Sequence, residues 1–227
     1  MTHGISPDRV AASFGAHAEL ARHIIDALGE DPAGSDGSHD LSHLLRVWRN
    51  AEAIAATEPG CDLPLLVAAV LLHDCVAVEK NSPQRAAASR LSAVRAIEIL
   101  GALGWDAERA EALGHAIETH SFASGLVPET LEARILRDAD KLDAIGAIGI
   151  ARCFYVAGRM ATSLYDADDF DATHRDLDDQ HYAIDHFQAK LFLVAEGFHT
   201  RAGQAMAVER SAVMRRFVDS FRSEVDA

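Results

Sequence analysis

The feature that most limits the fold of this chain is the apolar run LPLLVAAVLL, from Leu63 to Leu72, which leads directly into His73 and Asp74. The run is about half the length of the roughly 20 apolar residues that a membrane-spanning helix needs. It therefore predicts a helix in the core of a globular protein, and it argues against a membrane partner. The 227 residues, 49% of them hydrophobic, are enough to bury such a core.

Helical spacing of apolar residues continues along most of the chain, beginning with Ser6 and Pro7, a typical helix start. Apart from a short turn near residue 165, no alternating strand pattern appears, so the sequence indicates an all-α fold. The charge run at residues 166–179 predicts an exposed excursion. We expect helices at about residues 7–28, 40–57, 62–73, 84–100, 106–120, 129–144, 146–160, 180–195 and 201–224.

The charge balance restricts the partners. Lys and Arg number 21 against 35 Asp and Glu, a formal net charge of −14, so a long nucleic acid is disfavoured. A small phosphorylated substrate is still compatible, because a divalent ion and a few cations can reverse the field inside one pocket. Three cysteines at no ligand-like spacing and a polar N-terminus predict a reduced, cytoplasmic setting.

Four residues form an ordered set that predicts a metal site: His43, the pair His73 and Asp74, and Asp140. Taken singly, each is more often a helix cap or a surface side chain. Together they supply the imidazole nitrogens and carboxylate oxygens that bind a divalent cation, with positions left for water and substrate. An adjacent pair at a helix end can turn both side chains toward one point, because the helical period stops there.

The motifs around these residues resemble the HD-domain superfamily of metal-dependent phosphohydrolases, and within it the YedJ/YpgQ-like branch. The resemblance covers most of the chain. It rests on SHDLSHLLRVW at 38–48, LLHDCVAVEKNSPQR at 71–85, HAIETHSF at 115–122, RDADKLDAIGAIGIAR at 137–152 and DHFQAKL at 185–191.

This resemblance implies an HD-type helical bundle around the metal site, as a single domain over residues 1–227. Its core would span about 38–160 and a C-terminal helical extension about 180–224. His43, His73, Asp74 and Asp140 would hold one divalent ion, with Mn, Mg, Co, Ni and Fe all suitable. Asp74 would also accept a proton from the attacking water.

The resemblance further implies hydrolysis of a phosphate ester or anhydride of a small metabolite, with a nucleotide as the expected substrate. Relatives in the branch act as nucleoside triphosphate pyrophosphohydrolases. Some nucleotidases of the superfamily place a glutamate three residues after the Asp of the His-Asp pair. Ala77 stands at that position here, so a mechanism that needs this glutamate is not carried over, and Glu79 stays without a role.

Two further histidines are expected to assist catalysis. His39 precedes His43 by four residues, on the same helix face, and would support the site or donate a proton to the leaving group. His120 ends a helix and would reach the metal pocket. For His115, Asp138 and Asp143 the roles stay open, although Asp143 could orient a ligand and a solvated or ion-paired carboxylate is favoured for Asp138.

A phosphate clamp is expected from four cations: Arg46, one turn after His43, Lys80 and Arg85 in the irregular stretch after the His-Asp pair, and Lys190 in the C-terminal motif. Cys75 is expected to be a buried small side chain rather than a nucleophile, because no basic partner stands at a fixed spacing.

Two alternatives stay open. One is a non-catalytic nucleotide-sensing module, although a degenerate module would be expected to lose ligands. The other is a di-iron oxygenase, which needs more ligands than four and would have to recruit His115 and His120. The last predicted helix also carries an apolar stripe that could pack on the domain or on a second subunit in a homodimer: Met206, Val213, Met214, Phe217 and Phe221.

Overall fold

The structure is a computed structural model that describes residues 6–29, 41–78, 87–121 and 124–226. It divides into two compact units, Met1–Asp140 and Lys141–Ala227. The described residues are helical apart from loops and one isolated bridge between Ser163 and Tyr182, which confirms the all-α prediction. The single-domain boundaries stay a prediction, and each unit is described by itself.

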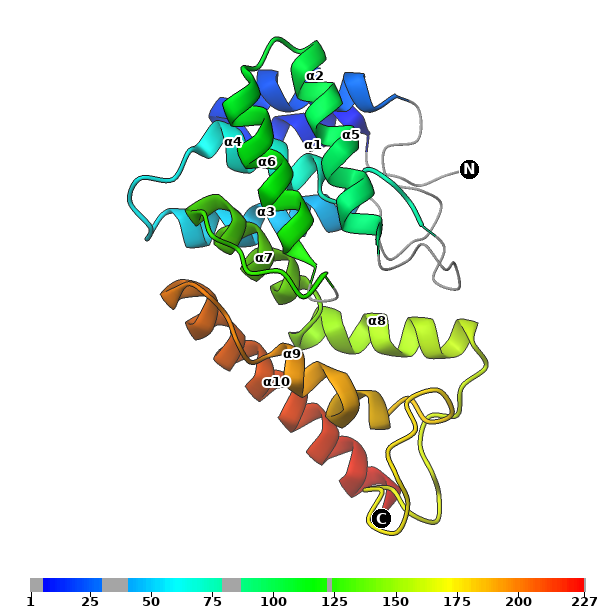
Figure 1. Ribbon diagram of the computed structural model, residues 1–227. Coiled ribbons are helices and arrows are strands. Elements are labelled where there is room, and N and C mark those ends of the chain that lie inside the picture. The colour runs from blue at the N-terminus through cyan, green and yellow to red at the C-terminus, as the bar shows by residue number, and fades with distance from the viewer. Residues whose placement is uncertain (1–5, 30–40, 79–86, 122–123, 227) are drawn as a thin grey trace. The chain divides into compact units, whose positions relative to one another are not determined.

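The first unit is a bundle of helices (Figure 1). Its elements are α1 (Pro7–Ala12), the 3₁₀ helix η1 (Gly15–His17), α2 (Ala18–Leu28), α3 (Leu41–Ala55), α4 (Leu63–Leu72), α5 (Ala88–Ala102), α6 (Ala107–His120) and most of α7 (Leu131–Asp143).

Helix α4 is the core of this unit, as its apolar sequence predicts. The eight residues from Leu65 to Leu72 are buried, and α2, α3, α5 and α6 contact the helix. Asp62 fixes its beginning, because the carboxylate accepts a hydrogen bond from the backbone N–H of Leu65 at 3.0 Å. Arg109 of α6 donates to both oxygens of the same carboxylate, at 2.8 and 2.9 Å. The helix that carries the His-Asp pair is therefore held at its start by a cap and an ion pair.

The prediction of one continuous helix over residues 7–28 is wrong. Gly15 has a φ of +56°, which interrupts the helix and leaves a 3₁₀ turn between α1 and α2. Apolar spacing persists across the break, because Phe14 is buried and stacks on Trp48 with ring centroids 4.7 Å apart. Periodicity alone therefore could not reveal the interruption.

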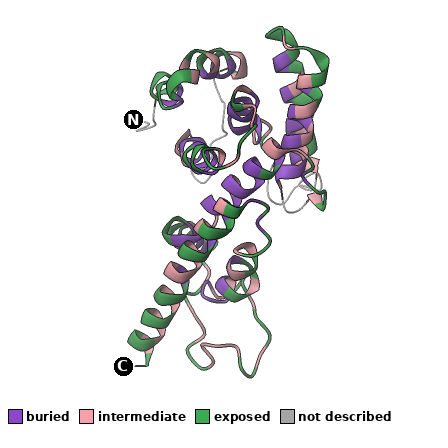
Figure 2. Ribbon diagram, turned by 90° about the vertical axis from the view of Figure 1, so that its left-hand side faces the viewer, coloured by how far each residue is buried: buried purple, intermediate pink, exposed green. Residues whose placement is uncertain are grey.

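The second unit contains α8 (Gly146–Arg159), the π-helix η4 (Phe187–Leu191), α9 (Phe192–Val194) and α10 (Arg201–Val225). The apolar stripe of α10 packs within its own unit. Met214 is buried, and the rings of Phe217 and Phe221 lie 5.7 and 6.2 Å from that of Phe154 on α8. The last turns of α10 are largely exposed in Figure 2. The homodimer stays a prediction.

The aspartate-rich segment at residues 166–179 is exposed or half-buried throughout, as predicted, and it is ordered around one cation. Arg175 lies 3.0 Å from a carboxylate oxygen of Asp166, donates a hydrogen bond to Asp185, and stacks over the ring of Tyr182. Asp185 is buried. The predicted helix at 180–195 consequently begins only at Asp185 and continues as η4 from Phe187, because the residues before Asp185 belong to this folded loop.

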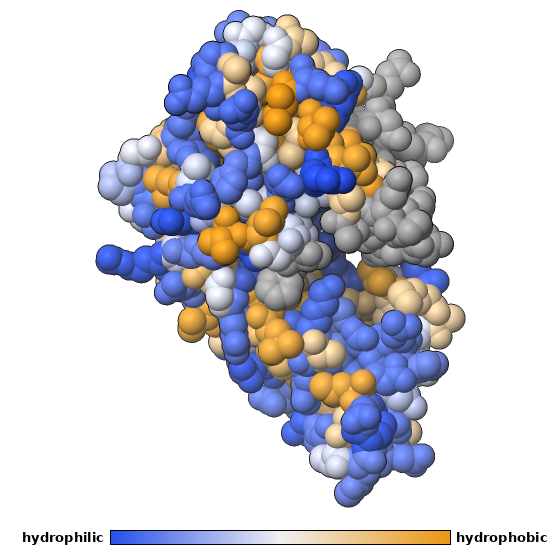
Figure 3. Space-filling view, in the orientation of Figure 1, coloured by the Kyte–Doolittle hydropathy of each residue, from blue (hydrophilic) through white to orange (hydrophobic). Residues whose placement is uncertain are grey.

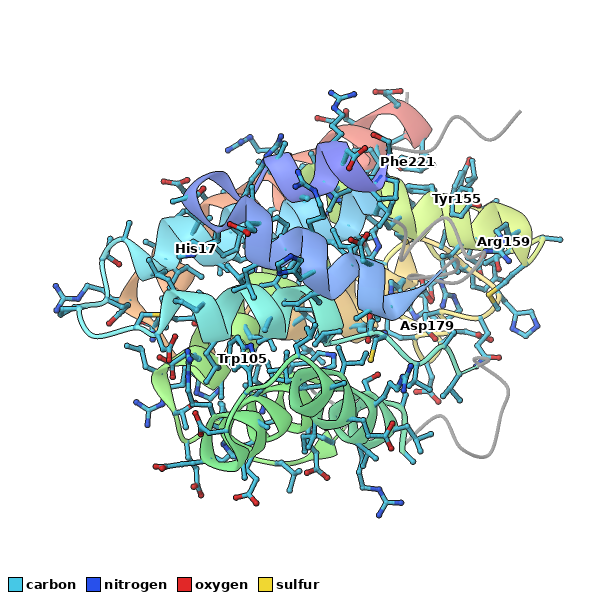
Figure 4. The ribbon with its side chains drawn as sticks, turned by 90° about the horizontal axis from the view of Figure 1, so that it is seen from above. His17, Trp105, Tyr155, Arg159, Asp179 and Phe221 are labelled. Carbon is cyan, nitrogen blue, oxygen red and sulfur yellow. The ribbon has the colours of Figure 1, made fainter. Side chains whose placement is uncertain are left out.

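The exposed surface is polar with scattered apolar residues. Among the described helices, none is both long enough and apolar enough to cross a membrane. The face drawn in Figure 3 is mostly hydrophilic, with hydrophobic residues in small separate groups. An example is Tyr155 of α8, which Figure 4 shows near Arg159; the guanidinium carbon lies 5.7 Å from the ring centroid.

Candidate metal centre

Three helices of the first unit bring the four predicted ligands together. His43 lies on α3 and Asp140 near the end of α7, whereas His73 is the C-cap of α4 and Asp74 follows it. His73 keeps helical dihedral angles, with φ −60° and ψ −32°, and the regular helix stops there. Both members of the His-Asp pair therefore contribute to one cluster, as expected for an adjacent pair at a helix end.

The first group of donors consists of His43, His73 and Asp140. The Nε2 atoms of the two imidazoles are 3.2 Å apart. The Oδ1 atom of Asp140 lies 3.5 Å from Nε2 of His43 and 3.9 Å from Nε2 of His73. Three helices thus point three donor atoms at one small volume.

A second group shares His73 and adds Asp74 and His120. Nε2 of His73 lies 3.7 Å from Oδ2 of Asp74, and Nε2 of His120 lies 3.6 Å from Oδ1 of the same carboxylate. The structure therefore brings His120, from the end of α6, to the predicted ligands.

Backbone carbonyls orient two of the imidazoles. Nδ1 of His73 lies 2.8 Å from the carbonyl oxygen of Val70, and Nδ1 of His120 lies 2.6 Å from that of Ile117. A carbonyl can only accept, so in both rings Nδ1–H is the donor. A neutral ring with its proton on Nδ1 has its lone pair on Nε2, which in His73 faces the cluster, the arrangement found in metal-binding histidines.

Burial and charge distinguish the two histidines. Burial lowers the pKa of His73, which keeps its ring neutral and able to bind a cation. For His120 burial acts in the same direction, but the hydrogen bond and the negative charge of Asp74 outweigh it and raise its pKa. The histidines are buried, whereas the side chains of Asp74 and Asp140 are 37% and 28% exposed. The carboxylates therefore form the solvent side of the cluster.

This donor set fits a divalent cation. Ligands about 2.0 to 2.2 Å from one ion lie about 3 to 3.5 Å from each other when they are neighbours around it. The observed separations between facing donor atoms, 3.2 to 3.9 Å, are close to that range. The two carboxylates repel each other and the imidazole lone pairs that face them. A cation bound among these groups would offset that repulsion.

The predicted substrate residues are distributed differently. Arg46 lies on α3, one turn after His43, and is half-buried. Lys190 is exposed on η4 in the second unit. His39, Lys80 and Arg85, like Glu79, lie outside the described residues.

The structure also shows the surroundings of His115, Asp138 and Asp143, for which the sequence left the roles open. Nε2 of His115 accepts a hydrogen bond from the backbone N–H of Glu129 at 3.1 Å, and His115 belongs to neither donor group. Asp138 is fully buried, which argues against a solvated carboxylate, and the ion-paired alternative stays a prediction. Asp143 pairs with Arg152 at 3.2 Å in the second unit, which agrees with an ion-paired carboxylate.

Cys75 is half-buried, and burial raises the pKa of its thiol to about 11. Its Sγ donates to the carbonyl oxygen of Ser92, whose hydroxyl accepts from the N–H of Val76. The thiol is therefore not activated as a nucleophile. Ser92 of α5 instead holds the two residues that follow Asp74.

Sequence reasoning missed a buried amide beside the cluster. Asn50 of α3 donates from Nδ2 to the carbonyl oxygen of Ala139 at 3.0 Å, and Ala139 precedes Asp140 on α7. The hydrogen bond ties the helix of His43 to the helix of Asp140. A polar residue seven positions after His43, on the otherwise apolar face of α3, was the available signal.

The helical bundle of the first unit brings three histidines and two aspartates together, a donor set that could hold a metal ion. A model of the HD domain matches residues 40–145. The uncharacterized protein YpgQ of Bacillus subtilis (strain 168) is 31% identical over 191 residues, which cover 82% of this chain and 84% of YpgQ. The chain belongs to the HD-domain superfamily of metal-dependent phosphohydrolases.

Solved structures agree with this assignment. A crystal structure of B. subtilis YpgQ in complex with ADP matches with a TM-score of 0.68 and 28% identity, covering 96% of this chain and 100% of that one. An HD-superfamily hydrolase from Bacillus thuringiensis matches with a TM-score of 0.70 and 26% identity, covering 92% and 97% of the two chains.

Proposed function

We propose that this protein hydrolyses a phosphate ester or anhydride of a nucleotide, with release of pyrophosphate from a nucleoside triphosphate as the first reaction to test. The observation that carries the proposal is the convergence of His43, His73, Asp74, His120 and Asp140 in one cluster. The ADP bound to the related YpgQ supports a nucleotide as the substrate class.

We assign His43, His73, Asp74 and Asp140 as ligands of one divalent cation. Such an ion, when bound, acts as a Lewis acid toward a phosphoryl oxygen and lowers the pKa of a coordinated water. His73 is suited to this role because its ring is held neutral and its Nδ1–H is bonded to Val70. His115 is set aside as a ligand, because its Nε2 already accepts the N–H of Glu129.

The chain's own residues move two protons. As a water oxygen bonds to phosphorus and the bond to the leaving oxygen breaks, Asp74 accepts a proton from the water. His120, whose pKa Asp74 raises, donates a proton from Nε2 to the leaving oxygen. The two groups are 3.6 Å apart, so one pocket holds both the base and the acid. His39 is a second possible donor from the sequence.

The phosphate groups need cations beside the cluster, because the chain carries a net charge of −14. We propose Arg46, Lys80 and Arg85 for this clamp; Lys190, in the second unit, stays a prediction from the sequence. Arg46 is supported by its position one turn from His43 on the helix that reaches the cluster.

The test is a screen for phosphate and pyrophosphate release from nucleoside mono-, di- and triphosphates, with Mn, Mg, Co, Ni and Fe supplied separately. Release that disappears in Asp74→Ala, together with weaker metal retention, is expected, because one carboxylate has both roles. Binding of nucleotides without release under any of the five metals would favour a sensing module instead. Two irons per chain with a di-iron chromophore would favour the oxygenase.

A further inference from the structure

Arg137 of α7 is buried in an unusual way. The residue is 8% exposed, yet within the described part of the chain no acidic side chain forms an ion pair with it, and Asp138 acts on it only through its charge. Its hydrogen bonds go to two backbone carbonyls: Nη1 donates to Thr119 at 3.2 Å and to Leu126 at 2.6 Å. Nε has no hydrogen-bond partner among the described residues, and burial lowers the pKa of the guanidinium. Burying a charged side chain without an ion pair lowers the stability of the fold. A contribution to stability therefore does not explain why Arg137 is buried here.

The carbonyl of Thr119 lies at the end of α6, where the helix stops at His120. The last four carbonyls of a helix have no partner within it. In α6 the carbonyl of Ile117 is satisfied by the imidazole of His120 itself, and that of Thr119 by Arg137. Thr119 is buried, so water does not reach its carbonyl oxygen. If Arg137 were removed, this oxygen would have no donor in its place.

The second carbonyl that accepts from Arg137 is that of Leu126. It belongs to residues 124–130, which come after α6 in the chain and which we call the strap. Hydrogen bonds hold the strap to the rest of the first unit: Leu126 and Pro128 accept from Arg137 and Arg134 of α7, and the N–H of Glu129 donates to Nε2 of His115 on α6. Arg137 stands one turn before Asp140 on α7. One guanidinium therefore connects the helix of Asp140, the end of the helix of His120, and the strap.

We propose that Arg137 is a positioning residue: by fixing the end of α6 against α7, it sets where the His120 imidazole stands relative to Asp74. This rests on the proton-donor role proposed above for His120. Both hydrogen bonds come from Nη1, at the tip of a rigid planar group. The ammonium group of Lys ends a flexible stem, so Arg137→Lys should hold the two carbonyls less firmly.

The test uses Arg137→Gln and Arg137→Lys, with Arg134→Gln as the matched control. Arg134 is on the same helix and donates to Pro128 of the strap at 3.3 Å, but it is exposed and, among the described residues, has no hydrogen bond to α6. In both Arg137 variants kcat should fall about tenfold to hundredfold, as for a displaced catalytic group, with KM and metal content unchanged. In a His120→Ala background the same substitutions should cause no further loss. Arg134→Gln should behave as wild type.

Two readouts separate this proposal from the proposed function. In protein labelled with ¹⁵N-histidine, the imidazole signals of His120 should shift in the Arg137 variants and not in Arg134→Gln, whether or not any nucleotide is hydrolysed. Losses that simply add to those of His120→Ala, or unchanged His120 signals, would overturn the positioning role. If Arg137→Gln does not fold, Arg137→Lys, which retains the charge, decides the question by the same two measurements.

Discussion

Metal-linked stability gives the most direct test of the site. In the folded chain, two carboxylates and three imidazoles converge so that the donor atoms within each group lie within 4.8 Å of one another. A cation that binds only this folded arrangement stabilises it by about 2.7 kcal/mol at a concentration 100-fold above its Kd. For a chain of this size each kcal/mol raises Tm by about 2 to 4 °C. Saturation with a suitable cation should therefore raise Tm by about 5 to 11 °C.

The measurement is thermal unfolding in EDTA and in each of the five cations. Asp140→Asn, which keeps the side-chain shape and removes one negative charge, should lose most of the shift. His181→Ala is the matched control, because this exposed histidine pairs with Asp178 in the second unit and should leave the shift intact. An identical Tm in EDTA and in all five cations, or a full shift in Asp140→Asn, would refute the assignment of this cluster as a metal site.

Three further predictions concern single side chains. Asn50→Leu should lower the free energy of unfolding by about 1 to 3 kcal/mol in urea titrations, because the buried carbonyl of Ala139 loses its donor; no loss would mean that water replaces the amide. The raised pKa of His120 contributes stability below its unfolded pKa of about 6.5, which is lost as pH rises through the higher folded value. In metal-free protein the stability difference between wild type and His120→Asn should therefore shrink with increasing pH, and a growing difference would contradict the sign. Arg46→Ala should reduce kcat/KM about tenfold to hundredfold at unchanged metal content, whereas the exposed Arg49→Ala on the same helix should not; equal effects of the two would remove Arg46 from the clamp.

The helices were predictable because their signals are local. The cap at Asp62 and the apolar run after it define α4, and Thr200 begins α10 where the sequence indicates a helix start. The four proposed ligands could be singled out for the same reason, since their motifs are short and adjacent to helix ends. The apolar pattern did not predict the helix break at Gly15, because a positive φ at one residue leaves the apolar spacing on both sides unchanged.

The aspartate-rich loop shows the limit of a reading based on composition. Residues 166–179 look like a solvated charge run, and only the fold reveals that Arg175 gathers Asp166 and the buried Asp185 around one guanidinium. The number of charges in a segment does not tell which opposite charge the fold will place beside each of them.

By itself, then, the sequence determined an all-helical chain with a set of metal-binding residue types at helix ends. The tertiary structure alone decided that His120 stands 3.6 Å from Asp74, that Asn50 joins two helices of the site, and that Arg137 caps the helix of His120. These are contacts between residues 18 to 89 positions apart. Helical periodicity fixes the face of a residue within its own helix, but the distance between two faces depends on how whole helices pack.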